Sequence, residues 1–168
     1  ENSVTPASFG MQPAKLVNIT FDVSVPVETD AKAIVRLLGN TYHLGYSFAE
    51  LSDGTSVFAS LAPTLEKSGE YHYSATLQLP AGMDLRYKYS LGDGFINAEH
   101  GEDGNFRVRQ LIIPEKDTII RDKVDSWYSS GTAPVKFQVT VPSNTPSGDA
   151  VSIQFKPYAW MQAIPMWN

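Results

Sequence analysis

Residues 17–25, with the sequence VNITFDVSV, carry the clearest structural signal in the chain. Every second position is apolar and the positions between are polar, the apolar ones being Val17, Ile19, Phe21, Val23 and Val25. This alternation predicts a β-strand with one buried and one exposed face, since successive side chains point to opposite sides of a strand. Pro26 follows and ends the strand, because proline has no N–H to donate to a sheet.

Short apolar or alternating runs recur between turn signals along the next ninety or so residues, as is typical of a β-sandwich. We expect further strands at 33–38, 55–61, 71–79, 85–91, 95–99 and 106–113. The alternation within 106–113 slips near Gln110, which predicts a bulge or bend there. Residues 117–127 fit a strand with a bend better than a helical turn. With no amphipathic helix predicted, the fold class is an all-β, immunoglobulin-like antiparallel β-sandwich.

An internal repeat divides the chain. The sequence FDVSVP at 21–26 returns as FQVTVP at 137–142, and the next strand, 33–37, is matched in pattern by 150–155. The organisation that we expect is an N-terminal extension at 1–16, a β-sandwich module at 17–128, a linker at 129–134, and the first two strands of a second, related module at 135–168.

Two strands cannot build an independent core. Residues 135–168 therefore belong either to a truncated repeat of a longer tandem array or to strands that pair with a neighbouring repeat or an identical subunit by strand addition. Both possibilities stay open at this point.

Composition narrows the classes of partner. Hydrophobic residues make up 42% of the 168 and charged residues 18%, which is typical of a globular protein. A net charge of -5 without any basic cluster argues against nucleic acid, and no apolar run is long enough for membrane insertion. There is no cysteine, so disulfides and thiolate metal sites are excluded. We expect an extracellular or cell-surface protein, exported through a signal peptide that this chain does not include.

Nothing in the sequence assembles into a catalytic site. The three histidines lie in different segments without metal-ligand spacing, and there is no nucleophile elbow or phosphate loop. Glu99 and Glu102 share one small loop and are a poor pair for glycoside hydrolysis. We therefore predict no enzyme activity and no cofactor. The oxygen-rich loop at 99–105 offers an alternative, a Ca²⁺ site, against the simpler interpretation of a solvated hairpin loop.

Several short motifs follow one another in a defined order. They are 21–26 (FDVSVP), 38–40 (LGN), 44–46 (LGY), 79–82 (LPAG), 87–89 (YKY) and 105–107 (NFR). This order resembles the starch-binding domains of amylases and glucoamylases, carbohydrate-binding modules of the family twenty type, over residues 17–127. The resemblance implies a starch-binding-domain-like sandwich with a shallow site for an α-glucan.

In that family two exposed tryptophans flank a lysine. The resemblance places the lysine at Lys88 and aromatic residues, none of them tryptophan, near 46–48 and at 95. A pyranose stacks its C–H face on such rings, and its hydroxyls need polar partners. The predicted carbohydrate-binding residues are Tyr46, Phe48, Lys88, Phe95, Asn97 and Glu99. In the alternative interpretation, Phe48 and Phe95 are core residues and Lys88 is the solvent-side member of its strand.

Two functions follow from these observations. The first is a non-catalytic module of an exported multidomain protein that binds a polysaccharide or oligosaccharide of the α-glucan, starch-like class. The alternative is a structural β-sandwich subunit of a cell-surface array or filament, assembled by strand addition through 135–168.

Overall fold

The computed structural model describes residues 14–45, 62–92, 98–128, 135–154 and 164–166. Besides one short 3-10 turn, η1 (Tyr42–Leu44), these residues contain only strands. The strands are β1 (Leu16–Ser24), β2 (Val35–Gly39), β3 (Glu66–Gly69), β4 (His72–Pro80), β5 (Asp84–Leu91), β6 (Arg109–Ile112), β7 (Thr118–Lys123), β8 (Ser152–Ile153) and β9 (Ile164–Pro165).

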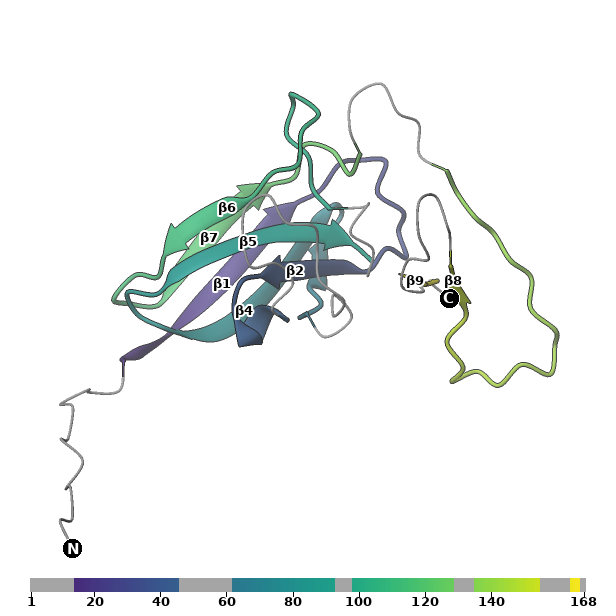
Figure 1. Ribbon diagram of the computed structural model, residues 1–168, viewed down its shortest axis with the longest axis horizontal. Helices are drawn as coiled ribbons and strands as arrows, with labels where there is room; N and C mark the ends of the chain where they lie inside the picture. The colour runs from purple at the N-terminus through teal and green to yellow at the C-terminus, as the bar shows by residue number, and fades with distance from the viewer. Residues whose placement is uncertain (1–13, 46–61, 93–97, 129–134, 155–163, 167–168) are drawn as a thin grey trace, which may run out of the picture.

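Two sheets lie face to face and confirm the predicted β-sandwich (Figure 1). One has the strand order β3-β4-β1-β7 and the other β2-β5-β6. All pairs within them are antiparallel except β1 with β7, which run parallel in the register Ile19 to Thr118. The first and last strands of the sandwich are therefore neighbours, a pairing that alternation alone does not reveal.

The alternating side chains of β1 fill the space between the sheets, as predicted. Ile19, Phe21 and Val23 have no exposed surface, and the Phe21 ring meets the edge of Tyr87 from β5 at 5.2 Å between centroids. Each such buried side chain stabilises the fold by about 1.5–3 kcal/mol. Trp127 is also buried, and its Nε1 donates to Thr29 Oγ1 at 2.8 Å.

The expected strands at 33–38, 71–79, 85–91 and 117–127 correspond to β2, β4, β5 and β7. Strand β3 was not predicted, because its four residues are all exposed and only pairing with β4 defines it. The strand expected at 55–61 and most of that expected at 95–99 lie outside the described residues.

The bulge predicted at Gln110 is absent, because β6 pairs with β5 in unbroken register from Arg109 to Ile112. The alternation slips for a different reason. Val108 packs in a small second cluster with Leu38 and Ala62, whereas Ile113 is buried in the main core between the sheets. The apolar residues thus change from one face of the segment to the other.

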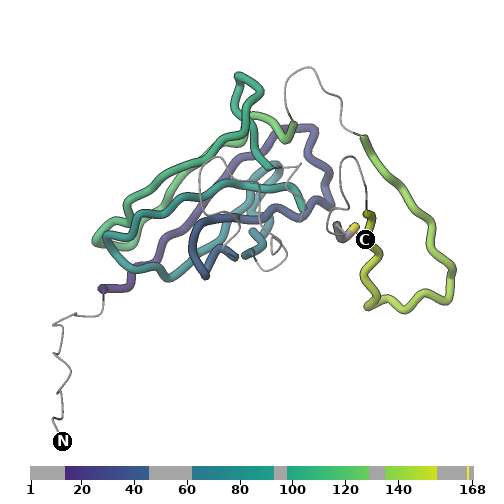
Figure 2. The backbone as a smooth tube through the Cα atoms, in the orientation of Figure 1, coloured from purple at the N-terminus to yellow at the C-terminus, as the bar shows by residue number. Residues whose placement is uncertain are grey.

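Residues 135–142 repeat the pattern of β1 but belong to no strand. Figure 2 shows this segment running outside the sandwich. The first strand expected for the second module is therefore absent here, since no neighbouring sheet covers its apolar face. The second expected strand is present only as the two residues of β8, which pair with β9. The assignment of 135–168 to a second module stays a prediction.

Candidate functional site

Lys88 lies on the outer face of β5, on the opposite side from Tyr87 and Tyr89, which belong to the core. It is nevertheless only 2% exposed, and its Nζ lies 5.7 Å from the centroid of the Phe106 ring. Burial lowers the pKa of Lys88, and the negative charge of Glu99 opposes this shift. The alternative interpretation of Lys88 as a solvent-side residue is therefore wrong, because Lys88 lies beneath the surface.

Phe106 is the aromatic residue that lies over Lys88. Its ring also stacks on His100, with centroids 4.4 Å apart and 33° between the planes. His100 is buried, and its backbone N–H donates to the carbonyl oxygen of Ser126 at 2.8 Å. Burial lowers the pKa of His100, which favours the neutral ring. Phe106 itself is 48% exposed. Its ring is therefore half-exposed and packs on the buried side chains of Lys88 and His100.

Glu99 has no exposed surface, and its carboxylate forms hydrogen bonds inside the protein. Its Oε1 accepts hydrogen bonds from the Tyr89 backbone N–H and from Arg109 Nε, both at 3.0 Å, and its Oε2 accepts one from an Arg109 Nη at 2.7 Å. Burial raises the pKa of Glu99, while the Arg109 guanidinium acts in the opposite direction. Both carboxylate oxygens are therefore occupied.

Arg109 continues this network to the other sheet. A second guanidinium nitrogen donates to Asp122 Oδ1 on β7 at 2.9 Å. Asp122 Oδ2 accepts from the hydroxyls of Tyr87 and Tyr89 on β5, at 3.0 Å and 2.8 Å. Side-chain hydrogen bonds thus join the two sheets along the edge formed by β6 and β7, where each strand pairs on one side only.

An open polar groove of about 760 Å³ runs along this edge. One wall is formed by residues 101–109 and the other by 121–125. Phe106 lines the groove, and Arg107 crosses it to Asp125 with an N–O distance of 2.8 Å. The groove therefore places an exposed aromatic ring beside planar charged groups, a combination suited to ligands that are apolar on one face and polar at the edge.

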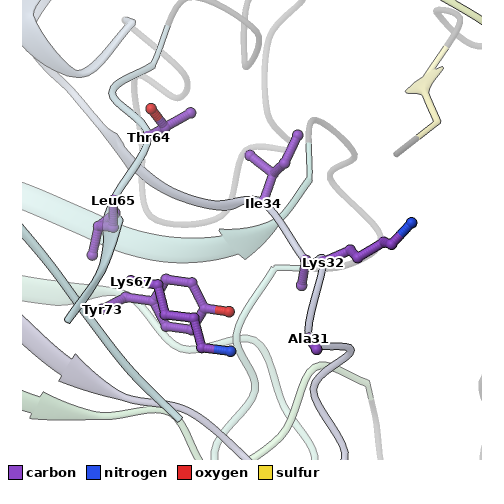
Figure 3. Close-up of a pocket in the computed structure, with 8 residues that line it drawn as sticks. Ala31, Lys32, Ile34, Thr64, Leu65, Lys67 and Tyr73 are labelled. Carbon is purple, nitrogen blue, oxygen red and sulfur yellow. The ribbon is translucent and has the colours of Figure 1, made fainter. Parts of the chain in front are cut away.

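A smaller hollow of about 310 Å³ lies at the edge of β2 (Figure 3). Its lining mixes aliphatic residues, including Ile34 and Leu65, with polar ones, and Lys67 and Tyr73 lie side by side at one end. Tyr73 is buried, so this hollow offers no exposed aromatic ring.

The structure describes two of the predicted site residues, Lys88 and Glu99, and both are buried. The others, Tyr46, Phe48, Phe95 and Asn97, lie outside the described residues. Sequence reasoning missed Phe106. The break in alternation near Gln110 could have indicated the exposure of Phe106. It puts Phe106 and Val108 on the opposite face from Ile113, which is buried in the main core.

The loop at 99–105, expected to hold Ca²⁺, contains hydrogen bonds between its own residues. The carboxylate of Asp103 accepts from the backbone and side-chain nitrogens of Asn105 at 3.1 Å and 3.0 Å, and this lowers the pKa of Asp103. Among the described residues, no group of three or more histidines and carboxylates is placed to hold a metal ion. The same residues contain no helix long and apolar enough to cross a membrane.

Comparison with known proteins adds structural relatives only. No protein-family model matches the sequence, and no curated protein matches it. Among solved structures, a glycoside hydrolase family 15 glucoamylase from Hypocrea jecorina is similar at 21% identity and a TM-score of 0.51. That similarity covers 68% of this chain, and the chain spans only 18% of the glucoamylase.

Two further structures are similar at lower scores. A glucoamylase from Hormoconis resinae has 18% identity and a TM-score of 0.45, covering 73% of this chain and 19% of its own. The family 20 CBM of a maltotetraose-forming amylase from Pseudomonas saccharophila STB07 has 18% identity and a TM-score of 0.40, covering 64% of this chain and 99% of its own. At 21% identity and a TM-score of 0.51, the Hypocrea glucoamylase shows a shared fold alone: the chain has a β-sandwich like one segment of that protein.

Proposed function

We propose that the chain is a non-catalytic carbohydrate-binding module that holds an α-glucan on the outer face of β5. The observation that carries this proposal is Phe106, a half-exposed ring fixed above Lys88 and His100. A pyranose stacks on such a ring at little entropic cost, because an aromatic side chain has few rotatable bonds. In this proposal, the residues predicted from the sequence outside the described part of the chain, Tyr46, Phe48, Phe95 and Asn97, also contact the sugar.

The charged groups beside this surface support binding without bond cleavage. Glycoside hydrolysis needs one carboxyl group to donate a proton and a second to act across the bond. Glu99 and Asp122 are instead both bound to Arg109, which keeps them from acting as such a pair. The fold is compatible with a binding module but does not by itself assign one. We place the module in an exported, multidomain protein outside the cell.

Affinity electrophoresis in gels that contain soluble starch or other glucans tests the proposal. We expect starch to retard the parent protein, and the Lys88→Ala, Phe95→Ala double variant to migrate as it does without polysaccharide. A Lys116→Ala, Phe137→Ala double variant removes the same two residue types outside the proposed surface and serves as the control.

Lys88 is buried, so its removal can disturb folding. A Phe106→Ala variant and a Lys88→Met variant, checked by circular dichroism, separate loss of binding from loss of structure. Migration of the parent protein that no glucan alters would refute the proposed function.

A second candidate function rests on a separate observation. In the segment 135–141 the apolar side chains at every second position are 42–73% exposed, namely Val135, Phe137, Val139 and Val141. A strand-like pattern whose alternate apolar side chains are this exposed is suited to pairing with an identical subunit. Sedimentation velocity tests this candidate. Assembly that grows with concentration and is lost in Phe137→Ser would support it, and a monomer at every concentration would exclude it.

A further inference from the structure

The groove along the edge of β6 and β7 is separate from the surface above β5, but the two meet at Phe106. It exists because β6 pairs only with β5 and β7 only with β1, which leaves the sandwich open on this side. Its volume, about 760 Å³, lies within the range of small-molecule sites, about 300–1,000 Å³. The opening is therefore large enough for part of an oligosaccharide.

The polar groups of the groove are held in place before any ligand arrives. Asp125 is bound from two sides, by Arg107 at 2.8 Å and by Lys123 at 3.1 Å. Below them, Arg109 is fixed between Glu99 and Asp122. Groups that are already ordered lose little conformational entropy when they bind a ligand.

One arginine of the groove has its hydrogen-bonding capacity unused. Arg121 is exposed on β7, and its side chain forms no ion pair or hydrogen bond with the described residues. Its planar guanidinium has five N–H donors, and the partly exposed Arg107 adds donors of the same kind. Adjacent hydroxyl oxygens of a sugar match such paired donors.

The charge of the groove favours a neutral ligand. Four acidic residues and four basic residues line it, so their formal charges cancel. An anionic or cationic chain would gain little from this balance, whereas neutral hydroxyl groups can both donate to the carboxylates and accept from the guanidinium groups.

From this arrangement we infer that the groove binds a second pyranose unit of a neutral oligosaccharide. The first unit lies on the exposed side of Phe106, and the next extends into the groove toward Arg107 and Arg121. This inference rests on the proposed function, since it extends the same sugar chain beyond the surface above β5. It makes Arg107 and Arg121 specificity-determining residues for chain length.

Titration calorimetry with a short and a long neutral malto-oligosaccharide tests the inference. We expect the long ligand to bind the parent more tightly than the short one. The Arg107→Gln, Arg121→Ala double variant should lose about tenfold in affinity for the long ligand, as expected for a charge-assisted hydrogen bond of about 1.5 kcal/mol. Its affinity for the short ligand should be unchanged.

Lys67→Ala is the control, because Lys67 is an exposed basic residue of β3, which lies at the opposite edge of its sheet from β7 and outside the groove. The thermal midpoints of all variants should agree with the parent. Equal losses for both ligands, no loss for either, or tighter binding of an acidic oligosaccharide than of a neutral one would overturn the groove assignment while carbohydrate binding stands. A parent protein without affinity for any oligosaccharide would refute both proposals.

Discussion

The chain contains one strand pattern twice, with opposite outcomes. Phe21 and Val23 in β1 have no exposed surface, whereas their counterparts Phe137 and Val139 are 50% and 56% exposed. Both segments have the same alternation and both end at a proline. The difference is in their neighbours, since β4 and β7 flank β1 on both sides and 135–142 has no partner strand among the described residues. Alternation gives a segment one apolar face, but the segment forms a strand only where neighbouring strands pair with it and a second sheet covers that face.

Hydrogen exchange gives the largest expected contrast. Amides of β1 exchange through global unfolding, which costs about 5 kcal/mol or more, whereas those of 137–141 need almost no opening. We expect exchange rates that differ by more than about a thousandfold, measured by mass spectrometry of peptides from the two segments. Comparable protection of both segments would show that 137–141 is covered in solution and would remove the contrast.

Truncating the equivalent phenylalanine in each segment measures the same difference as a change in the free energy of unfolding. Phe21→Ala should lower the free energy of unfolding by about 4 kcal/mol, because it leaves a cavity between the sheets. Phe137→Ala should change it by less than about 0.5 kcal/mol, as is usual for exposed positions. Urea denaturation of both variants provides the measurement. A similar cost at the two positions would contradict the structure of 135–142.

A second pair compares ionic contacts of the two regions. Arg109→Ala leaves the buried Glu99 without its partner and should cost about 3 kcal/mol in denaturation experiments. Lys136 forms an ion pair with Asp30 at 3.1 Å on the surface. Lys136→Ala removes this ion pair and should leave the midpoint of the unfolding curve unchanged, because water and salt screen pairs at the surface. Equal effects would mean that the Glu99 network is not buried in solution.

The smallest effect concerns alkaline pH. Burial, and then the charge of Asp122, raise the pKa of Tyr87 and Tyr89 above their usual value near 10. The unfolded state loses these protons above pH 10 while the folded state keeps them, so stability falls as pH rises further, by about 1.4 kcal/mol per unit and tyrosine. Tyr89→Phe should make this decline shallower. The exposed Tyr42 is the control, and Tyr42→Phe should leave the slope unchanged.

The sequence predicted the parts of the fold that depend on local periodicity. Strands β1, β4 and β5 were found because their apolar residues alternate or run together. The polar edge strand β3 and the parallel neighbour of β1 could not be found, since both depend on pairing between distant segments. The same limit applies to Glu99, which resembles a solvated loop residue in sequence but is buried and forms an ion pair with Arg109, ten residues away in the sequence.

For the candidate site, resemblance identified Lys88 but not the ring above it. Phe106 belongs to a motif quoted for the family order, yet a position in that motif does not tell which face a side chain occupies. Its exposure depends on the segment from 106 to 113 presenting apolar residues first on one face and then on the other. A slip in alternation is therefore as informative as a regular alternation.

The parallel pairing of β1 with β7 has a mechanical consequence. Since the chain enters the sandwich at the start of β1 and leaves it at the end of β7, the two attachment points lie at opposite ends of these adjacent strands. A pulling force between them loads the hydrogen bonds from Ile19 to Ser24 in shear, all together, and cannot open them one after another. A module threaded in this way resists extension along the direction in which a flow or an anchored polymer would stretch it.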